Sequence, residues 1–562
     1  GVGGHFADDA VDEAAAIVDA AIVSSDVTAD GGVTVDALST QAIRAASLAG
    51  AVAVAGGQVG VAVSGSGSAV ENRINSDVSA RIAGAATDMQ ADHVVVNADD
   101  ISSIDAVSAA MAISAAFGQT GVAVSIGISV AINNIANDVT ATIADGAVST
   151  SGAQGIIISA STPELPIDAP VADVVIPVSV SDLDDLAVAE MDGEETRDEV
   201  DFAADAILAE DIADALRGQG FEIVGTVKVA ALEEGERWTA IDEEGRSVAL
   251  SLVNGQILAS KAGINAVSGA AALSVAAGQI GVGIAGAGAV ALNAIQTNVA
   301  ASTSGADLTT TGSGDVVIDA RSDVEINAAV LAVSAAVAAG QVGVGVGIGV
   351  SVARNFIGRD LTGNTVADTG AVSAFASDTT MDLSGDLTIH AESAQSIRAL
   401  TFAGAAAVAA GQVGVGVAGS GAYAENVIDA TTEAYIDGDG TGISASAVSV
   451  SAEDASTIDA YGGSVAVAAG FGMVGVAVSA GIGIGFNAIG SDVLAEIRNT
   501  DDGVESTAGA VTIEAMNTAA ITAGTAAAAL AVSGGLVGVS FAGAGAYAEN
   551  EITGATAARI TD

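Results

Sequence analysis

The sequence IRALTFAGAAAVAAGQVGVGVAGSGAYAENVI (residues 397–428) consists of two alternating arms that meet at Gly411-Gln412. A Gly-X pair suits a two-residue type II′ turn, because the first turn position requires a positive φ. Folding the arms back on this turn as an antiparallel hairpin gives two cross-strand pairs: Arg398 with Glu425, and Ile397 with Asn426. Opposite charges that face each other in register with a turn predict a long β-hairpin as the structural unit.

The same unit recurs seven times. Its turns lie at Gly57-Gln58, Gly118-Gln119, Gly278-Gln279, Gly340-Gln341, Gly411-Gln412, Gly472-Met473 and Gly535-Leu536. The residue fifteen positions before each second turn residue is isoleucine: Ile43, Ile104, Ile264, Ile326, Ile397, Ile458 and Ile521. The residue fourteen positions after it is asparagine: Asn72, Asn133, Asn293, Asn355, Asn426, Asn487 and Asn550. The charge pair recurs as Arg44 with Glu71. We therefore predict an all-β repeat protein of seven antiparallel hairpin units, about 61 residues each, in an extended or rolled, β-solenoid-like sheet.

Composition narrows the function classes. Apolar residues make up 51% of the chain but aromatic residues only 3%, so the apolar mass is mainly Ala, Val, Gly and Ile. With 69 acidic and 15 basic residues the net charge is −54. Nucleic acid is excluded as an expected partner, because binding phosphates requires a basic surface. The chain has no cysteine, so it has neither disulfides nor a thiolate site.

One long interval between turns, from Gln119 to Gln279, predicts an inserted domain. We expect a degenerate preceding repeat at 1–38, two repeats at 39–162, an acidic insertion at 163–260 and five repeats at 261–562, cut within a longer array. All four prolines lie near the start of the insertion: Pro163, Pro166, Pro170 and Pro177. Helical spacing of apolar residues over 199–217, followed by strand-like segments over 221–232, 237–244 and 246–259, predicts a small α+β module after a proline-rich linker.

The arms alternate strictly between two faces. From Val413 to Ile436 one face carries small or apolar residues without charge, and the other is apolar near the turn and polar farther away. In the incoming arm, Ser393 and Gln395 mark a predicted bend. Seven and nine positions after the second turn residue, outer-face residues are Gly-Gly in odd repeats and bulkier in even ones, as in Gly419/Gly421 and Ile348/Val350. Such a surface indicates that neighbouring hairpins interlock, or that the glycines curve the sheet.

No catalytic constellation emerges from the residues. The three histidines, His5, His93 and His390, have no companions at ligand or triad spacing, and we read them as surface residues. The glycine-rich runs continue as strand and lack the lysine and helix of a nucleotide loop. Asp437 and Asp439 are the one weak calcium candidate, with a plain turn favoured. We predict no enzyme and no cofactor beyond loosely bound calcium.

Several segments follow a repeat pattern that also occurs in known surface proteins: INNIANDVTATI, AENVIDATTEAYI, FNAIGSDVLAEI, DVVIDARS and LTIHAES. They resemble repeats of large bacterial surface exoproteins, the haemagglutinin- and leukotoxin-like passengers, over nearly all of the chain except the insertion. The resemblance implies an elongated, secreted, β-solenoid-like protein at the surface of a bacterium. The unbroken hairpin phase departs from a solenoid of short rungs.

Two functional classes follow. The first, which we favour, is a structural segment of a giant extracellular protein that self-associates through its apolar small-residue faces into a fibre, sheath or adhesin-like stalk. In the second, the near-turn halves of the hairpins contact the membrane as a large outer-membrane β-barrel or pore, because the doubly apolar part of each arm has the length of a membrane strand.

Overall fold

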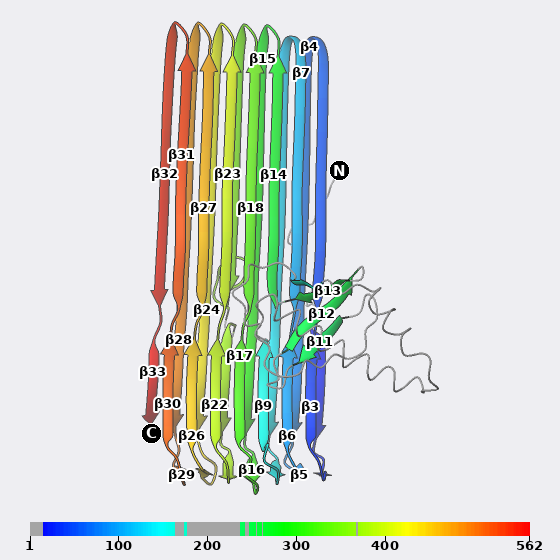
Figure 1. Cartoon of the computed structure of the whole chain (residues 1–562), viewed down its shortest axis with the longest axis vertical. Helices are drawn as coiled ribbons and strands as arrows, with labels where there is room; N and C mark the ends of the chain where they lie inside the picture. Colours follow the sequence, from blue (N-terminus) through cyan, green and yellow to red (C-terminus); the bar gives the residue numbers. More distant parts are fainter. Residues whose placement is uncertain are drawn as a thin grey trace, which may run out of the picture.

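One repeat of the sequence forms one turn of a tall, flattened coil (Figure 1). The computed structural model describes residues 15–162, 174–176, 237–241, 247–253, 256–260, 262–366 and 369–562. In a representative rung, β22 (Leu387–Ser393) and β23 (Ser396–Ala410) run toward the turn end, and β24 (Val413–Asp437) runs back from it. A short strand, β25 (Ile443–Ala445), lies at the far end before the next rung begins.

The strands pair in parallel between successive rungs, not antiparallel within a rung. Strand β23 pairs with β18 (Glu325–Ala339) and β27 (Thr457–Phe471), so that Ile397 aligns with Ile326 and Ile458. Strand β24 pairs in the same way with β19 (Val342–Ile357) and β28 (Val474–Arg498). The predicted antiparallel hairpin sheet is therefore wrong. The two arms of one repeat lie in opposite layers and meet through their side chains.

Parallel stacking replaces the hairpin because it lets the charge-free faces of the two arms cover each other. In a single hairpin sheet, the charge-free faces of both arms would lie on the same side and would still need a covering layer. In the coil these faces turn toward each other, and each residue pairs with its equivalent one rung away, as Asn426 does with Asn355 and Asn487. Identical residues then form rows along the stack, which is the arrangement that in-register parallel sheets favour.

The remaining strands follow this plan. The incoming arms are β14 (Gly263–Ala277), β18, β23, β27 and β31 (Ala520–Gly534), and the outgoing arms are β15 (Ile280–Ser304), β19, β24, β28 and β32 (Val537–Thr553). In the first two rungs one strand continues through the turn: β4 (Ala42–Ala83) and β7 (Ser103–Ala144). Three shorter strands pair with the far halves of outgoing arms: β1 (Ala16–Val23), β20 (Ala371–Ser377) and β33 (Thr556–Thr561).

Two smaller parallel sheets complete the far end. The first contains β3 (Val33–Ser39), β6 (Val94–Asp100), β9 (Ile156–Thr162), β17 (Val316–Ser322), β22, β26 (Val448–Asp454) and β30 (Val511–Asn517). The second contains β2 (Val27–Thr28), β5 (Asp88–Ala91), β8 (Ala147–Thr150), β16 (Asp307–Thr310), β21 (Thr380–Leu383), β25 and β29 (Val504–Ser506).

The core changes in character along each arm. Near the turns the buried side chains are small, mainly alanine and serine, and a Cβ added to Gly416 would lie 2.5 Å from the carbonyl oxygen of Ala469 in the facing sheet. The two backbones therefore approach more closely than any larger side chain would allow. Farther down, isoleucines of both arms, such as Ile397 and Ile428, share one buried cluster. At the far end a wider core contains Val, Ile, Leu and Met.

The inserted region differs from the α+β module expected for it. Its described strands, β10 (Val174–Ile176), β11 (Arg237–Ile241), β12 (Ser247–Val253) and β13 (Gln256–Ser260), form an antiparallel four-stranded sheet, and all regular elements in the described part of the chain are strands. The described chain is thus all-β, and the α+β assignment is corrected. The predicted helix over 199–217, the strand-like segment over 221–232 and the four prolines lie outside the described residues.

The predicted bend is present where the insertion enters. Strand β22 ends at Ser393 and β23 begins at Ser396. The insertion leaves the coil at the equivalent corner, after β9 and before β14. Because this corner already interrupts the ladder, an insertion there leaves the pairing of β14 with β7 and β18 intact.

Candidate functional site

The turn glycines stack on one another, and this stacking explains them better than the predicted turn type does. Gly57 and Gly535 have positive φ, 142° and 149°, but Gly411 does not. A Cβ added to Gly411 would instead overlap the carbonyl oxygen of Gly340 in the preceding turn. The predicted type II′ turn is therefore wrong for Gly411, and the close passage of the neighbouring turn is what requires glycine there.

The predicted cross-turn ion pairs are replaced by pairs along the stack or within one strand. Arg398 Nη1 lies 2.9 Å from Glu325 Oε1 on the neighbouring rung. Glu425 Oε2 accepts a hydrogen bond from Arg354 Nε at 2.8 Å. In the first rung the partners are Arg44 with Asp105, at 3.3 Å, and Glu71 with Arg73, at 3.7 Å. The parallel register places Arg354 beside Glu425 and Arg44 beside Asp105 on neighbouring strands of one sheet, which allows these pairs to form.

The seven asparagines form a continuous hydrogen-bonded ladder. Each side-chain Nδ2 donates to the Oδ1 of the next rung, and the six N–O distances are all between 2.7 and 2.8 Å. Asn133, Asn293, Asn355 and Asn426 are fully buried. The sequence identified every member of this row but paired Asn426 with Ile397 across the turn. The row therefore serves the stacking of rungs.

The calcium candidate has the geometry of a turn. Asp437 Oδ1 accepts from Asn499 Nδ2 at 2.7 Å, and this hydrogen bond is the main reason that the pKa of Asp437 is lowered. Asp439 is buried and accepts from the backbone N–H of Asp502 at 3.3 Å, while Gly438 has φ of 74°. Within the described residues, no group of three or more His, Cys, Asp or Glu side chains is arranged to hold a metal.

The described histidines take part in local polar contacts. His93 Nδ1 lies 3.3 Å from Asp92 Oδ2. His390 Nδ1 lies 2.9 Å from Ser451 Oγ, and its Nε2 lies 3.5 Å from Glu392. His390 thus contacts one serine hydroxyl group and one carboxylate, and both contacts lie within the parallel sheet that contains β22 and β26. His5 lies outside the described residues.

Buried carboxyl groups at the corners were missed by sequence reasoning. Asp100, the last residue of β6, accepts hydrogen bonds from Ser76 Oγ at 2.7 Å, Ser102 N at 2.8 Å and Asn137 Nδ2 at 3.0 Å. Burial raises the pKa of Asp100, and it raises the pKa of the adjacent Asp99 to about 6. Asp454 occupies the same corner position in β26 and accepts from Ser456 Oγ at 2.6 Å. The Asp-x-Ser spacing at both corners was a signal that could have found them.

The most extensive surface feature is a charge-free band around the turn end. We define the near-turn band as the eleven residues before and after each Gly-X turn; none of these residues is charged in any repeat. Their outward side chains are apolar and well exposed on both sheets, including Leu48 (77%), Leu400 (57%) and Ile482 (53%). Below the band the outer face of β24 turns polar, with Glu425, Asp429 and Glu433. The molecule thus has an apolar half and an acidic half.

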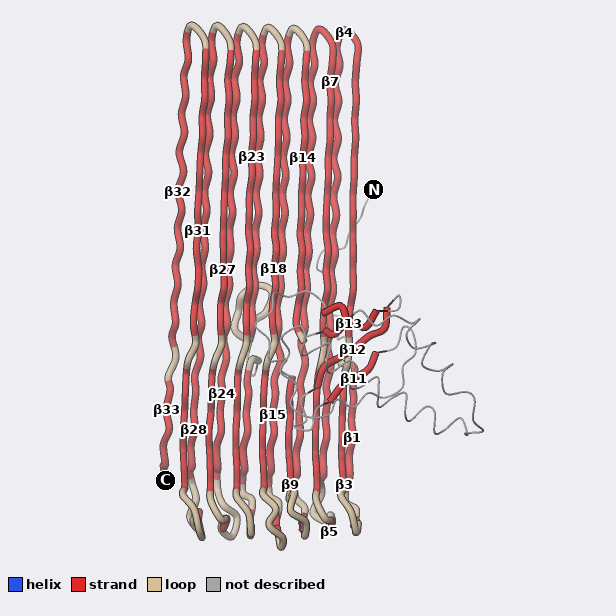
Figure 2. The backbone as a smooth tube through the Cα atoms, in the orientation of Figure 1, coloured by secondary structure: helices blue, strands red, loops and turns tan. Residues whose placement is uncertain are grey.

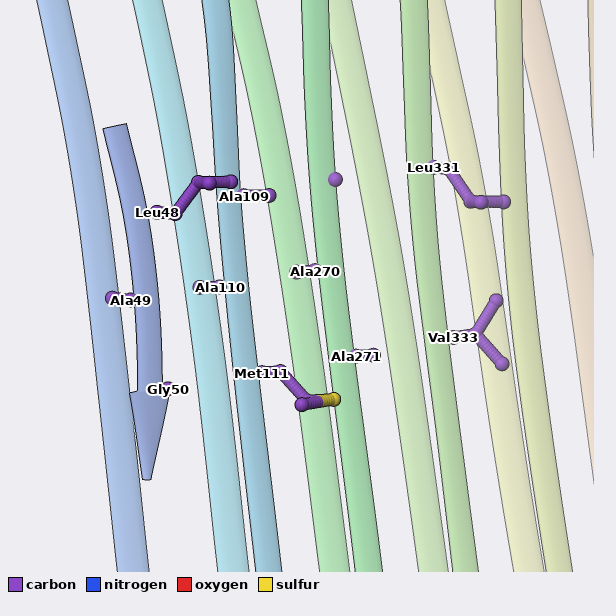
Figure 3. Close-up of a pocket in the computed structure, with 11 residues that line it drawn as sticks. Leu48, Ala49, Gly50, Ala109, Ala110, Met111, Ala270, Ala271, Leu331 and Val333 are labelled. Atoms are coloured by element: carbon purple, nitrogen blue, oxygen red, sulfur yellow. The ribbon is translucent and has the colours of Figure 1, made fainter. Parts of the chain in front are cut away.

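On the incoming sheet, the band contains a shallow apolar groove of about 470 Å³. Figure 3 shows Leu48 and Met111 projecting on one side of it and Leu331 and Val333 on the other. Its floor consists of small residues, among them Gly50, Ala109, Gly269 and Ala271. The groove has no charged lining residue, so it suits apolar contacts and offers no acid–base chemistry.

An aromatic row marks the border of the band on the outgoing sheet. The rings of Tyr423, Phe486 and Tyr547 follow one another along the stack with centroids 5.9 and 5.6 Å apart. The hydroxyl group of Tyr423 donates to Glu425 Oε2 at 3.0 Å. Each tyrosine therefore has its ring on the apolar side and its hydroxyl group on the acidic side.

Comparisons with protein-family models, with curated proteins and with solved structures found no match. In the part of the chain that is described, no helix is long and apolar enough to cross a membrane.

Proposed function

We propose that this chain is a structural repeat segment of a larger extracellular or cell-surface protein of a bacterium, which assembles into a fibre, sheath or adhesin-like stalk. The observation that carries the proposal is the unbroken asparagine ladder, which runs through all seven rungs with six hydrogen bonds. Each rung aligns with the next in the same register, with identical residues in the isoleucine and asparagine rows. A stack of this kind can grow without a change in its cross-section.

The distribution of charge supports the same proposal. The far halves of the arms carry acidic residues on their outer faces and keep the assembly hydrated, because a high net charge opposes non-specific association. The near-turn band has no charge and leaves apolar surface for contacts between molecules. The resemblance to surface exoproteins agrees with this use, and neither enzymatic activity nor a cofactor is part of the proposal.

Sedimentation and electron microscopy of the 562-residue chain in detergent-free buffer test the proposal. We expect concentration-dependent, elongated or laterally ordered assemblies whose fibre diffraction shows a spacing of about 4.7–4.8 Å along the stack. Particles that remain single chains at every concentration would contradict it.

A charged substitution within the near-turn band tests whether assembly uses this surface. Val415→Asp adds a carboxylate to the outer face of β24 within the near-turn band, where an assembly would bury it without a partner. Assembly should weaken by at least tenfold. Thr431→Asp is the matched control, since it adds the same charge to an exposed position on the same strand, outside the band. Equal assembly of both variants would argue against contacts through the band.

Membrane contact is the second candidate, and the height of the band favours it. Eleven residues at about 3.3 Å each span roughly 36 Å, close to the hydrocarbon thickness of about 30 Å. The aromatic row at the border of the band suits a membrane–water boundary. Flotation with phosphatidylcholine vesicles separates the two candidates. Retention in the lipid fraction after a carbonate wash, without assembly in buffer, would favour the membrane.

A further inference from the structure

The outgoing sheet carries a corrugated outer face within the near-turn band. We call the outward glycines of odd rungs the hollow glycines: Gly65, Gly67, Gly286, Gly288, Gly419, Gly421, Gly543 and Gly545. We call the outward residues of even rungs the ridge residues: Ile126, Ile128, Ile348, Val350, Ala480 and Ile482. The parallel register places Gly286 between Ile126 and Ile348, so rows of hollows and ridges alternate from one rung to the next.

No described residue of the chain fills the hollows. A Cβ added to any hollow glycine would have no heavy atom within 4 Å, and none of these residues has a positive φ. The inner-face glycines differ, since a Cβ on Gly416 would approach the backbone of the facing sheet. Glycine weakens a strand because it loses more backbone entropy and has no side chain to pack. The fold of one chain therefore does not explain the hollow glycines, and the sequence-based idea that neighbouring hairpins interlock through them is wrong.

The ridge residues are correspondingly unpacked on their outer side. Ile128 and Ile348 are each 50% exposed, although they lie in the interior of a sheet and not at its edge. Branched apolar side chains at this exposure project from the surface between two glycine rows. The face thus has knobs and holes at the same spacing.

We propose that this face packs against the same face of a second copy of the chain, with the ridges of each copy seated in the glycine hollows of the other. The inference rests on the proposed structural function and identifies its lateral contact. Ridges in alternate rungs lie about 9.5 Å apart, twice the strand spacing of a β-sheet. A partner that fits must repeat at that spacing, and an identical face, shifted by one rung, supplies both the ridges and the hollows.

The size and shape of the face are sufficient for such a contact. Seven rungs at about 4.8 Å and eleven residues at about 3.3 Å give a face of roughly 1,200 Å². A stable interface needs about 800 Å² from each partner. The face has no charge, so the contact leaves no unpaired ion. Figure 2 shows the strands running side by side with little twist, so two such faces can meet along their whole length.

Substituting the hollow glycines by valine tests the inference. Interlocking predicts that such a variant self-associates more weakly, whereas non-specific hydrophobic association predicts that it self-associates more strongly. The variant Gly286→Val/Gly419→Val adds side chains that point into open space and should leave the fold intact. Thr431→Val is the matched control, because it places the same branched apolar side chain at an exposed outward position of β24 outside the near-turn band. Sedimentation velocity over a range of concentrations measures self-association, and far-UV circular dichroism with thermal unfolding checks the fold of each variant.

We expect the dissociation constant of the hollow variant to rise at least tenfold and that of the control to stay unchanged or fall. Ile126→Ala/Ile348→Ala, which removes ridges, should weaken association in the same direction. If the hollow variant associates as tightly as the parent chain or more tightly, the interlocking contact is refuted while the structural function stands. If the parent does not self-associate but floats with phosphatidylcholine vesicles, lipid is the occupant, and both proposals fail.

Discussion

The asparagine ladder allows the cost of one missing side chain to be worked out. Asn426 is fully buried; its Oδ1 accepts from Asn355 at 2.7 Å and its Nδ2 donates to Asn487 at 2.8 Å. In Asn426→Ala both partners lose a hydrogen bond. Asn355 and Asn487 cannot bond to each other, because they lie two rungs, or about 9.5 Å, apart.

The expected destabilisation follows from these two orphaned groups. A buried polar group left without a partner costs about 1–3 kcal/mol, so Asn426→Ala should lower the free energy of unfolding by about 4 kcal/mol. Asn550→Ala is the internal control. Asn550 lies on the exposed last rung and makes one ladder bond, in which it accepts from Asn487 at 2.8 Å. Water can replace that bond, and we expect a loss of about 1 kcal/mol.

Urea-induced unfolding followed by far-UV circular dichroism measures both variants. The slope of the transition should stay constant if each variant unfolds from the same structure. A loss below about 1 kcal/mol for Asn426→Ala, or equal losses at the two positions, would refute the view that the buried ladder holds the rungs in register.

Three further predictions concern the turns, the corners and the insertion. Gly411→Ala should destabilise the chain by about 2 kcal/mol because its methyl group overlaps the turn below, whereas Gly419→Ala should be neutral or slightly stabilising; equal urea midpoints would contradict the stacking argument. The folded-state pKa of Asp99 is raised from 3.8 to about 6, so the folded state binds the extra proton in this window and stability falls as pH rises through it. Between pH 3.5 and pH 7 the free energy of unfolding of the parent chain should therefore fall by about 3 kcal/mol relative to that of Asp99→Asn. A difference in unfolding free energy that does not change with pH would exclude an effect of this carboxyl group. Deletion of residues 163–258 should leave the β-sheet circular dichroism signal of the rungs in place, because the insertion enters at a corner that already interrupts the ladder; loss of that signal would show that the coil depends on the insertion.

Much of the local architecture could be predicted from the sequence because it depends on spacing. The 61-residue step between Gln412 and Met473 is one turn of the coil, and the alternation over 413–436 assigns the buried and exposed faces as the structure has them. Ser393 and Gln395 indicated the corner. The candidate site was partly accessible as well, since the near-turn band is a charge-free stretch in every repeat. The buried corner carboxyl groups of Asp99 and Asp100 were not, because an acidic residue in a polar segment ordinarily indicates a solvated surface.

By itself, then, the sequence determined the repeat length, the turn positions, the rows of equivalent residues and the face on which each side chain lies. The tertiary structure alone decided which strands are hydrogen-bonded. A period of two residues is the same in an antiparallel hairpin and in a parallel stack, because side-chain alternation records faces and not the direction of the backbone hydrogen bonds. The choice depends on burial: stacking lets the small faces of the two arms, such as those carrying Ala407 and Ala418, cover each other. Parallel stacking also gives Arg398 and Glu425 separate partners, Glu325 and Arg354, and it places the asparagines in one ladder.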